Sequence, residues 1–247
     1  MSAKTKLLNT KFLSGSTLKI IACISMFIDH MTLIVWKHYL SYVATLDYDL
    51  IQHYQKLYRL GRNIGRAAFP IYCFLLVEGF KHTGNRLKYL ARLLVMAVLS
   101  EHAFNLMVAD SNLDLTHQNV FLTLSISLAV IMGIHKVSMI EWLSDMTRTA
   151  SVMCITLAGG VAAYLLKTDY SYKGVIAVTA LYLLSYDRVL ICLGGAICFA
   201  WEKWAIPAFI PVFFYNGKRG LKAKYFFYLF YPLHIYLIYF VVNYLLP

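Results

Sequence analysis

Long apolar segments follow one another along almost the whole chain, and this pattern restricts its fold more than any other feature. The segments lie at 18–37, 63–80, 88–108, 119–135, 149–166, 173–186, 189–201, 204–215 and 225–246. A helix that crosses a bilayer needs about 20 mainly apolar residues. Only 14% of the 247 residues are charged, whereas soluble domains carry about 25% charged residues. We therefore expect an all-α fold, a polytopic transmembrane helical bundle that forms a single integral membrane domain over 1–247.

The nine apolar segments predict about nine spans. The segments at 189–201 and 204–215 are short for membrane spans, so the count lies within a range of about eight to ten. Lys and Arg concentrate at the cytoplasmic span ends when the N-terminus is placed in the cytoplasm, which agrees with the positive-inside rule. Residues 1–17 then form a basic cytoplasmic segment, and 38–62 form a long, tyrosine-rich exocytoplasmic loop. Such a loop is either a lid or binding loop, or an aromatic segment at the membrane interface.

Composition also narrows the range of partners and sites. The first apolar segment is long and no small-residue cleavage site follows it, so we expect a retained span of a multi-pass cell-membrane protein. The net charge of +11 is typical of membrane topology and of contact with anionic lipid headgroups. The lipid bilayer, and not nucleic acid, is therefore the expected partner. The five cysteines lie in apolar segments without metal-ligand spacing, which predicts neither disulfides nor a metal site.

Six polar residues lie inside the predicted spans, where they are costly and by default functional. Asp29 and His30 stand roughly 17–18 Å into the first span, past its middle. The others lie at compatible depths in later spans: Arg66, Glu101, Asn119 and His234. A single polar cavity lined by all six residues is a simpler explanation than six unrelated positions. The alternatives are structural ion pairs, proton-relay sites or, for Arg66, an interfacial position or a pairing with Asp29.

Acid–base chemistry is the activity that such a cavity would favour. His30 could act as a general base near neutral pH, with Asp29 or Glu101 orienting its ring. Arg66 or Asn119 could stabilise an oxyanion, for which one donor is typically worth a few kcal/mol.

Cations near the predicted cytoplasmic ends favour an anionic ligand. Lys19 stands eleven residues before His30 and therefore faces the same side of the helix, about 16 Å away. An elongated cofactor could lie along that face, although Lys19 could also simply snorkel to the interface. Further cations suit phosphates or merely follow the positive-inside rule: Lys81, Arg86, Lys88, Arg92, Lys218 and Arg219.

This ordered set of residues resembles the TraX family of membrane proteins and, more distantly, acyltransferase family 3 and the heparan-glucosaminide acetyltransferases. The resemblance covers nearly the whole chain and is carried by Leu18-Lys19 before Asp29-His30, Gly65-Arg66 with Phe69-Pro70, Tyr172 with Gly174, and Phe230-Tyr231 with His234. Acyltransferase family 3 has an arginine where Lys19 stands, and lysine lacks the bidentate phosphate recognition of arginine. The family resemblance implies a location in the bacterial cytoplasmic membrane.

The resemblance implies acetyl transfer from cytoplasmic acetyl-CoA to an acceptor amine or hydroxyl at the outer membrane face, such as a peptide N-terminus or a glycan. We therefore predict an enzyme, an acetyl-CoA-dependent acyltransferase with acetyl-CoA as its co-substrate. The predicted roles are catalysis for His30, Asp29 and Glu101, oxyanion or substrate binding for Arg66, Asn119, His234 and Tyr172, and acetyl-CoA binding for Lys19, Lys81, Arg86, Lys88, Arg92, Lys218 and Arg219.

Two other classes of function stay open at this point. A proton-coupled transporter or channel could use the same buried Asp, His and Glu residues as a relay. A non-enzymatic membrane partner, such as an immunity or assembly factor, is the third possibility. The sequence specifies neither the acceptor molecule nor the oligomeric state.

Overall fold

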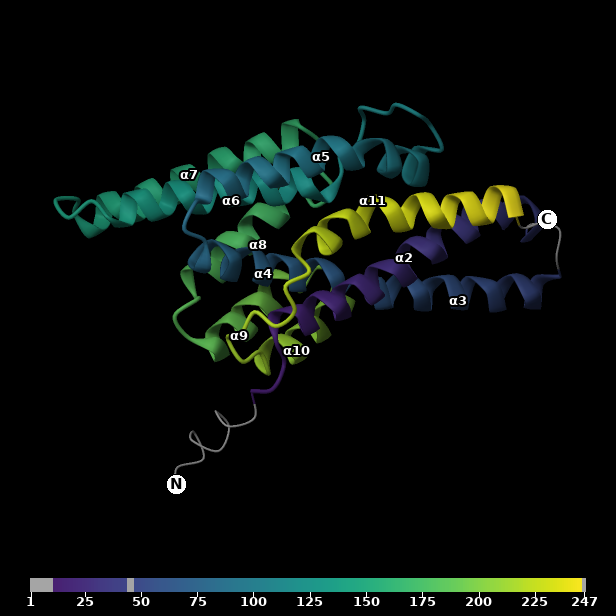
Figure 1. Ribbon diagram of the computed structural model, residues 1–247, viewed down its shortest axis with the longest axis horizontal. Helices are drawn as coiled ribbons and strands as arrows, with labels where there is room; N and C mark the ends of the chain where they lie inside the picture. Colours follow the sequence, from purple (N-terminus) through teal and green to yellow (C-terminus); the bar gives the residue numbers. More distant parts are fainter. Residues whose placement is uncertain (1–10, 44–46, 246–247) are drawn as a thin grey trace, which may run out of the picture. The chain divides into compact units, whose positions relative to one another are not determined.

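The computed structural model describes residues 11–43 and 47–245, and in these ranges the chain is helical without a strand, as Figure 1 shows. The all-α prediction is therefore confirmed. The helices are α2 (Gly15–Val43), α3 (Tyr48–Gly65), α4 (Ala68–His82), α5 (Arg86–Ala109), α6 (Val120–Ser138), α7 (Asp145–Leu165), α8 (Ser171–Leu183), α9 (Arg188–Cys198), a 3₁₀ helix (Lys203–Ala208), α10 (Phe209–Phe213), α11 (Lys224–Phe240) and a π-helical end (Val241–Leu245).

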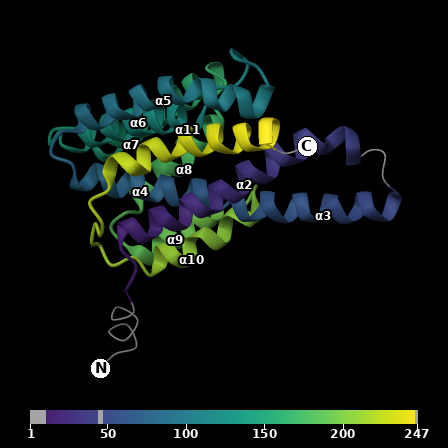
Figure 2. The same cartoon turned by 45° about the vertical axis from the view of Figure 1, so that its right-hand side comes forward.

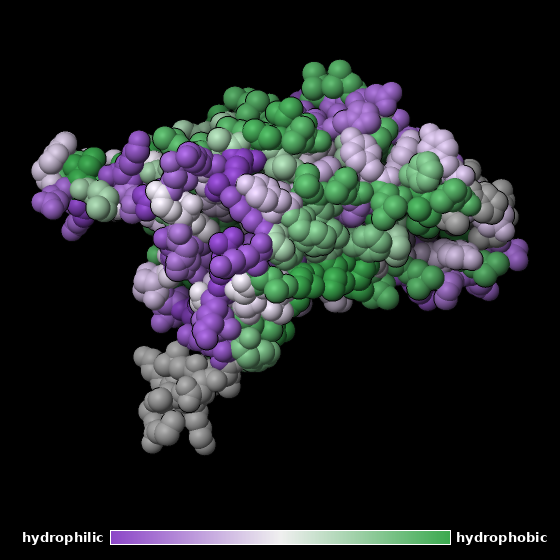
Figure 3. All heavy atoms as spheres, in the orientation of Figure 1, coloured by the Kyte–Doolittle hydropathy of each residue, from purple (hydrophilic) through white to green (hydrophobic). Residues whose placement is uncertain are grey.

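Within the described chain, five helices are long and apolar enough to cross a membrane. They are Gly15–Tyr39 of α2, α5, α6, α7 and the continuous segment Lys224–Leu245. Several apolar helices are compatible with the predicted multi-pass protein in a lipid bilayer, and Figure 3 shows the apolar surface (green) that such a bilayer would cover. The count of about nine spans and the cytoplasmic N-terminus stay predictions.

The chain divides into two compact units. Unit 1 comprises Met1–Tyr72, Ala103–Asn112 and Ala200–Pro247, and unit 2 comprises Cys73–His102 and Leu113–Phe199. The single domain over 1–247 stays a prediction. Of the predicted basic segment 1–17, residues 1–10 lie outside the described part of the chain.

In unit 1, α2 packs against both α3 and α11 (Figure 2). The contacts between α2 and α11 advance together along the two helices. Lys19 lies over the Phe227 ring, His30 contacts His234, and His38 contacts Asn243. These two helices are therefore parallel.

The packing of α3 on α2 depends on two glycines four residues apart. A Cβ atom on Gly61 would lie 2.1 Å from Oγ1 of Thr32, and one on Gly65 would lie 2.3 Å from Cβ of Asp29. Small residues with this spacing allow two helix backbones to approach closely. The contacts run in opposite directions along the two helices, which are therefore antiparallel.

The predicted loop over 38–62 is mostly helical in the structure. The end of α2 and most of α3 occupy this range, and α3 is amphipathic. Its tyrosines and basic residues are interspersed at helical spacing, a pattern that also fits the interfacial alternative. The side of the membrane on which this segment lies stays a prediction.

In unit 2, α6, α7 and α8 pack together around a small apolar core of Val130, Ile134, Ala163 and Val175. Gly159 allows α7 to approach α6, because a Cβ atom there would lie 2.2 Å from a methyl of Val130.

Candidate functional site

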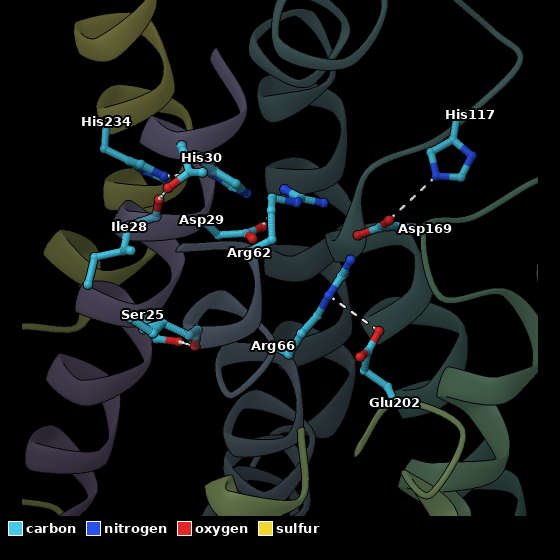
Figure 4. Close-up of polar contacts among 12 residues, drawn as sticks. Ser25, Ile28, Asp29, His30, Arg62, Arg66, His117, Asp169, Glu202 and His234 are labelled. Carbon is cyan, nitrogen blue, oxygen red and sulfur yellow. Dashed lines mark hydrogen bonds and ion pairs between the residues drawn. The ribbon is translucent and has the colours of Figure 1, made fainter. Parts of the chain in front are cut away.

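Two buried histidines meet in unit 1, one from α2 and one from α11 (Figure 4). Nδ1 of His30 and Nε2 of His234 lie 2.8 Å apart, and the two rings are stacked with centroids 4.9 Å apart. His30 is 8% exposed and His234 is 4% exposed. Nδ1 of His234 lies 2.6 Å from the carbonyl oxygen of Phe230, one helical turn earlier. The three groups therefore form a continuous chain of hydrogen bonds.

The carbonyl at one end gives this chain a direction when both rings are neutral. A neutral imidazole has one donor and one acceptor nitrogen, and a carbonyl can only accept. Nδ1–H of His234 therefore donates to Phe230, its Nε2 accepts, and Nδ1–H of His30 is the donor of the 2.8 Å bond. Nε2 of His30 is left as an acceptor that no described residue engages. The pair thus presents one imidazole lone pair, on Nε2 of His30, where two apolar helices pack together.

Asp29, the residue before His30 in the sequence, takes part in an ion pair. Nη1 of Arg62 donates to Oδ2 of Asp29 at 3.0 Å, and both side chains are mostly buried. The approach of α3 at Gly61 and Gly65 places Arg62 there, because the arginine lies between the two glycines. Sequence reasoning missed Arg62 by placing it in a loop. The Gly-x-x-x-Gly spacing with an arginine inside it is the signal that could have identified it.

The ion pair that the structure shows for Asp29 is with Arg62, whereas one predicted alternative paired Asp29 with Arg66. Its Nε instead lies 3.3 Å from Oε2 of Glu202 (Figure 4). Glu202 precedes the 3₁₀ helix, so this ion pair ties the end of α3 to the segment before α10.

Glu101 and Asn119 contact each other in unit 2. Nδ2 of Asn119 donates to Oε2 of Glu101 and, at 2.7 Å, to the carbonyl oxygen of Ala97. Oδ1 of Asn119 accepts from the backbone N–H of Phe121 at 3.0 Å and so caps the start of α6. The side chain of Asn119 is fully engaged in structural bonds. The structure therefore assigns the six predicted residues to separate contacts within two units.

The other predicted binding residues also fall into separate groups. Tyr172 lines an apolar groove of about 560 Å³ between α7 and α8. In unit 2, Lys81 bonds to Glu78 and to the carbonyl oxygen of Ser185, and the Arg86 guanidinium stacks 4.3 Å from the Phe80 ring centroid. Two more of the predicted cations lie in unit 2: Lys88, which is exposed, and Arg92, which lies over the Tyr89 ring. The other three predicted cations, Lys19, Lys218 and Arg219, lie in unit 1.

A histidine–carboxylate pair that the sequence did not single out lies outside the helices of unit 2. Nε2 of His117 is 3.4 Å from Oδ1 of Asp169, and this hydrogen bond raises the pKa of His117. In the ranges that the structure describes, no group of three or more His, Cys, Asp or Glu side chains could hold a metal ion.

Comparison with known proteins decides the family. Residues 14–242 match the family model described as TraX protein. The chain belongs to the TraX family. Among curated proteins, this TraX-family chain is 31% identical to the probable fimbrial assembly protein FimC, serogroup H1, of Dichelobacter nodosus, over 90% of this chain and 93% of that protein. No solved structure matches it.

These findings overturn the predicted activity of the TraX-family chain. The family and the name of the relative point to fimbriae and their assembly, so the prediction of an acetyl-CoA-dependent acyltransferase is wrong. The expectation of acetyl-CoA as co-substrate is wrong for the same reason. The alternative of a proton-coupled transporter or channel likewise gives way to a role in fimbrial assembly. The residue types in the spans suggested acid–base chemistry, but such residues serve many functions and do not identify one.

Proposed function

We propose that this TraX-family protein is a multi-pass membrane component of fimbrial assembly. The observation that carries the proposal is its 31% identity to a probable fimbrial assembly protein over nearly the full length of both chains. Five helices that are long and apolar enough to cross a membrane support a role within the envelope. The assembly factor considered among the sequence alternatives is the class that agrees with both observations.

The residues of α2, α3 and α11 around the histidine pair form the working site in this proposal. Asp29, His30, Arg62 and His234 lie within apolar surroundings, where each polar group costs free energy unless it is paired. Arg62 donates to Oδ2 of Asp29, and both ring nitrogens of His234 are engaged within the chain, while Nε2 of His30 keeps an acceptor for a partner. A hydrogen-bond donor on a fimbrial component in the membrane would complete the chain of bonds.

Deletion and complementation in a fimbriate bacterium test both parts of the proposal. The chain, or its His30→Gln variant, is expressed in a strain that lacks the corresponding gene, and surface fimbriae are counted by electron microscopy. We expect the wild type to restore fimbriae and His30→Gln to fail. His53→Gln on the exposed side of α3 is the matched control and should restore them.

The two parts of the proposal fail in different ways. A deletion strain with a normal number of fimbriae contradicts the role in assembly. A His30→Gln variant that restores fimbriae like the wild type, at equal abundance in the membrane, contradicts the assignment of the site alone.

A further inference from the structure

The loop that leads into α11 is bonded to the start of α2. The backbone N–H groups of Gly15 and Ser16 donate to the carbonyl oxygens of Lys218 and Arg219, at 2.8 and 2.9 Å. Oγ of Ser16 in turn accepts from the backbone N–H of Leu221 at 2.9 Å. The first amides of α2 are thus satisfied by the loop, and the loop has a fixed position at the end of the helix.

Two glycines give this loop its shape. Gly217 and Gly220 have φ angles of +79° and +74°, which other residues rarely adopt. A Cβ atom on Gly220 would also lie 2.0 Å from Oγ of Ser16. Because the carbonyls of Lys218 and Arg219 face α2, their side chains are left exposed at the surface of the unit.

The two segments that meet at this loop carry cations and no carboxylate. Neither 11–28 nor 203–245 contains an Asp or Glu, whereas these ranges hold Lys11, Lys19, Lys203, Lys218, Arg219, Lys222 and Lys224. The Lys19 side chain is largely buried over the Phe227 ring, and Arg219 and Lys224 repel its charge. In the described chain, no hydrogen-bond acceptor contacts its ammonium group. Like charges held together in this way are stabilised by an anion.

The position of the loop indicates which anion it would meet. The two parallel apolar helices α2 and α11 both begin here, so the loop lies where both enter the membrane. Large apolar side chains next to the cations are exposed: Phe12, Leu221, Tyr225 and Phe226. Figure 3 shows this mixture of hydrophilic (purple) and apolar (green) surface around the start of α11. Cations beside exposed aromatic side chains are typical of the headgroup level of a bilayer.

We propose that the loop 216–222, together with Lys19, binds the phosphate group of an anionic phospholipid. Lys218 and Arg219 contact the phosphate from outside, and the Lys19 ammonium group contacts it from the end of the helix. The exposed aromatic side chains lie against the glycerol and the first part of the acyl chains. This site is independent of the histidine pair and of the proposed role in fimbrial assembly.

Lipid binding to the purified full-length protein tests the proposal. The probes are dioleoyl-phosphatidylglycerol and dioleoyl-phosphatidylcholine, added to protein in detergent, and the readout is the shift in apparent Tm with lipid concentration. We expect the anionic lipid to bind more tightly. One cation contributes roughly fivefold in affinity for an anionic lipid surface. Lys218→Gln with Arg219→Gln should therefore weaken binding by on the order of 25-fold.

A matched pair of substitutions serves as the control. Lys56→Gln with Arg59→Gln removes the same charge from exposed positions on α3, toward the other end of α2, and should leave binding unchanged. Equal affinity for the two lipids overturns the proposal, as does equal loss in the two double variants. Inorganic phosphate that stabilises the protein as well as the lipid does would assign the site to free phosphate instead.

A measurement on the wild type alone covers the case in which the double variant does not fold. Binding that depends on exposed cations weakens when salt is raised from about 0.05 M to about 0.5 M, because the screening length falls. Affinity for the anionic lipid that does not change over this range contradicts the proposal.

Discussion

Replacing Gly61 and Gly65 with alanine tests how α3 is held against α2 and, through it, how the Arg62–Asp29 ion pair is positioned. The added Cβ atoms would lie 2.1 Å from Oγ1 of Thr32 and 2.3 Å from Cβ of Asp29, whereas ordinary van der Waals contact begins at 3.4 Å. Both sites are therefore too close by more than 1 Å (3.4 − 2.1 = 1.3 and 3.4 − 2.3 = 1.1). The two helices must move apart to accommodate the methyl groups.

Two opposing effects set the magnitude. Overpacking costs about 1–3 kcal/mol at each site, so about 2–6 kcal/mol for both. Alanine is the better helix former and returns about 0.5–1 kcal/mol at each position, so about 1–2 kcal/mol for both. At the middle of each range the clash, about 4 kcal/mol, exceeds the gain, about 1.5 kcal/mol, and the double variant should lose about 2.5 kcal/mol of folding stability. For a chain of this length we expect a fall in apparent Tm on the order of 5–10 °C.

Thermal unfolding of the detergent-solubilised protein measures this loss. Gly84→Ala is the matched control, because a Cβ atom at Gly84 meets nothing within 4 Å. It should leave the apparent Tm unchanged or slightly raised. A double variant that unfolds at the same temperature as Gly84→Ala would refute the close approach of α3 to α2, and with it the reason given for the position of Arg62.

Two further predictions concern the ion pairs. Arg62→Ala leaves the mostly buried Asp29 carboxylate without its guanidinium and should lower the free energy of unfolding by about 3 kcal/mol. The double variant Asp29→Asn with Arg62→Gln should recover part of that loss, because it leaves no lone charge. A double variant no more stable in thermal unfolding than Arg62→Ala would contradict this. The hydrogen bond to Asp169 raises the pKa of His117 in the folded protein. The pair therefore stabilises the fold fully below pH 6.5, the pKa of His117 in the unfolded chain, and this stabilisation is lost as the pH rises through the pKa in the folded protein. The apparent Tm should therefore fall between about pH 6 and about pH 8, by the equivalent of at most about 1 kcal/mol for this exposed pair, and by less in His117→Gln; equal falls would count against the pair.

Hydropathy predicted the helical membrane fold because an apolar segment in lipid must satisfy its own backbone hydrogen bonds. It also singled out His30 and His234, since ionisable residues are conspicuous in apolar runs. The break before the short segment 204–215 could be read from Glu202, Lys203 and Pro207, and the structure places a 3₁₀ helix at this point. These features are local, which is why the sequence alone contains them.

The partners of the polar residues could not be predicted in the same way. Depth along a helix was treated as evidence of proximity, but depth does not specify which neighbour a side chain faces. Arg66 is therefore bonded to Glu202, which the pattern did not suggest, whereas Asn119 is bonded to Glu101, one of the six predicted residues. Arg62 was assigned to a loop because α3 is less apolar than a membrane span, and its contact with Asp29 depends on a helix packing that only the three-dimensional structure shows.

The parallel arrangement of α2 and α11 limits how the chain can be threaded through a bilayer. Both helices are long enough to cross, and both start on the same side. After α2 has reached the far side, the polypeptide must return to the near side before α11 can begin, so it crosses an odd number of times in between. When both helices cross, the total is then also odd, and the start of α2 and the end of α11 would face opposite compartments. Any topology with an even number of crossings is incompatible with the contact between His30 and His234.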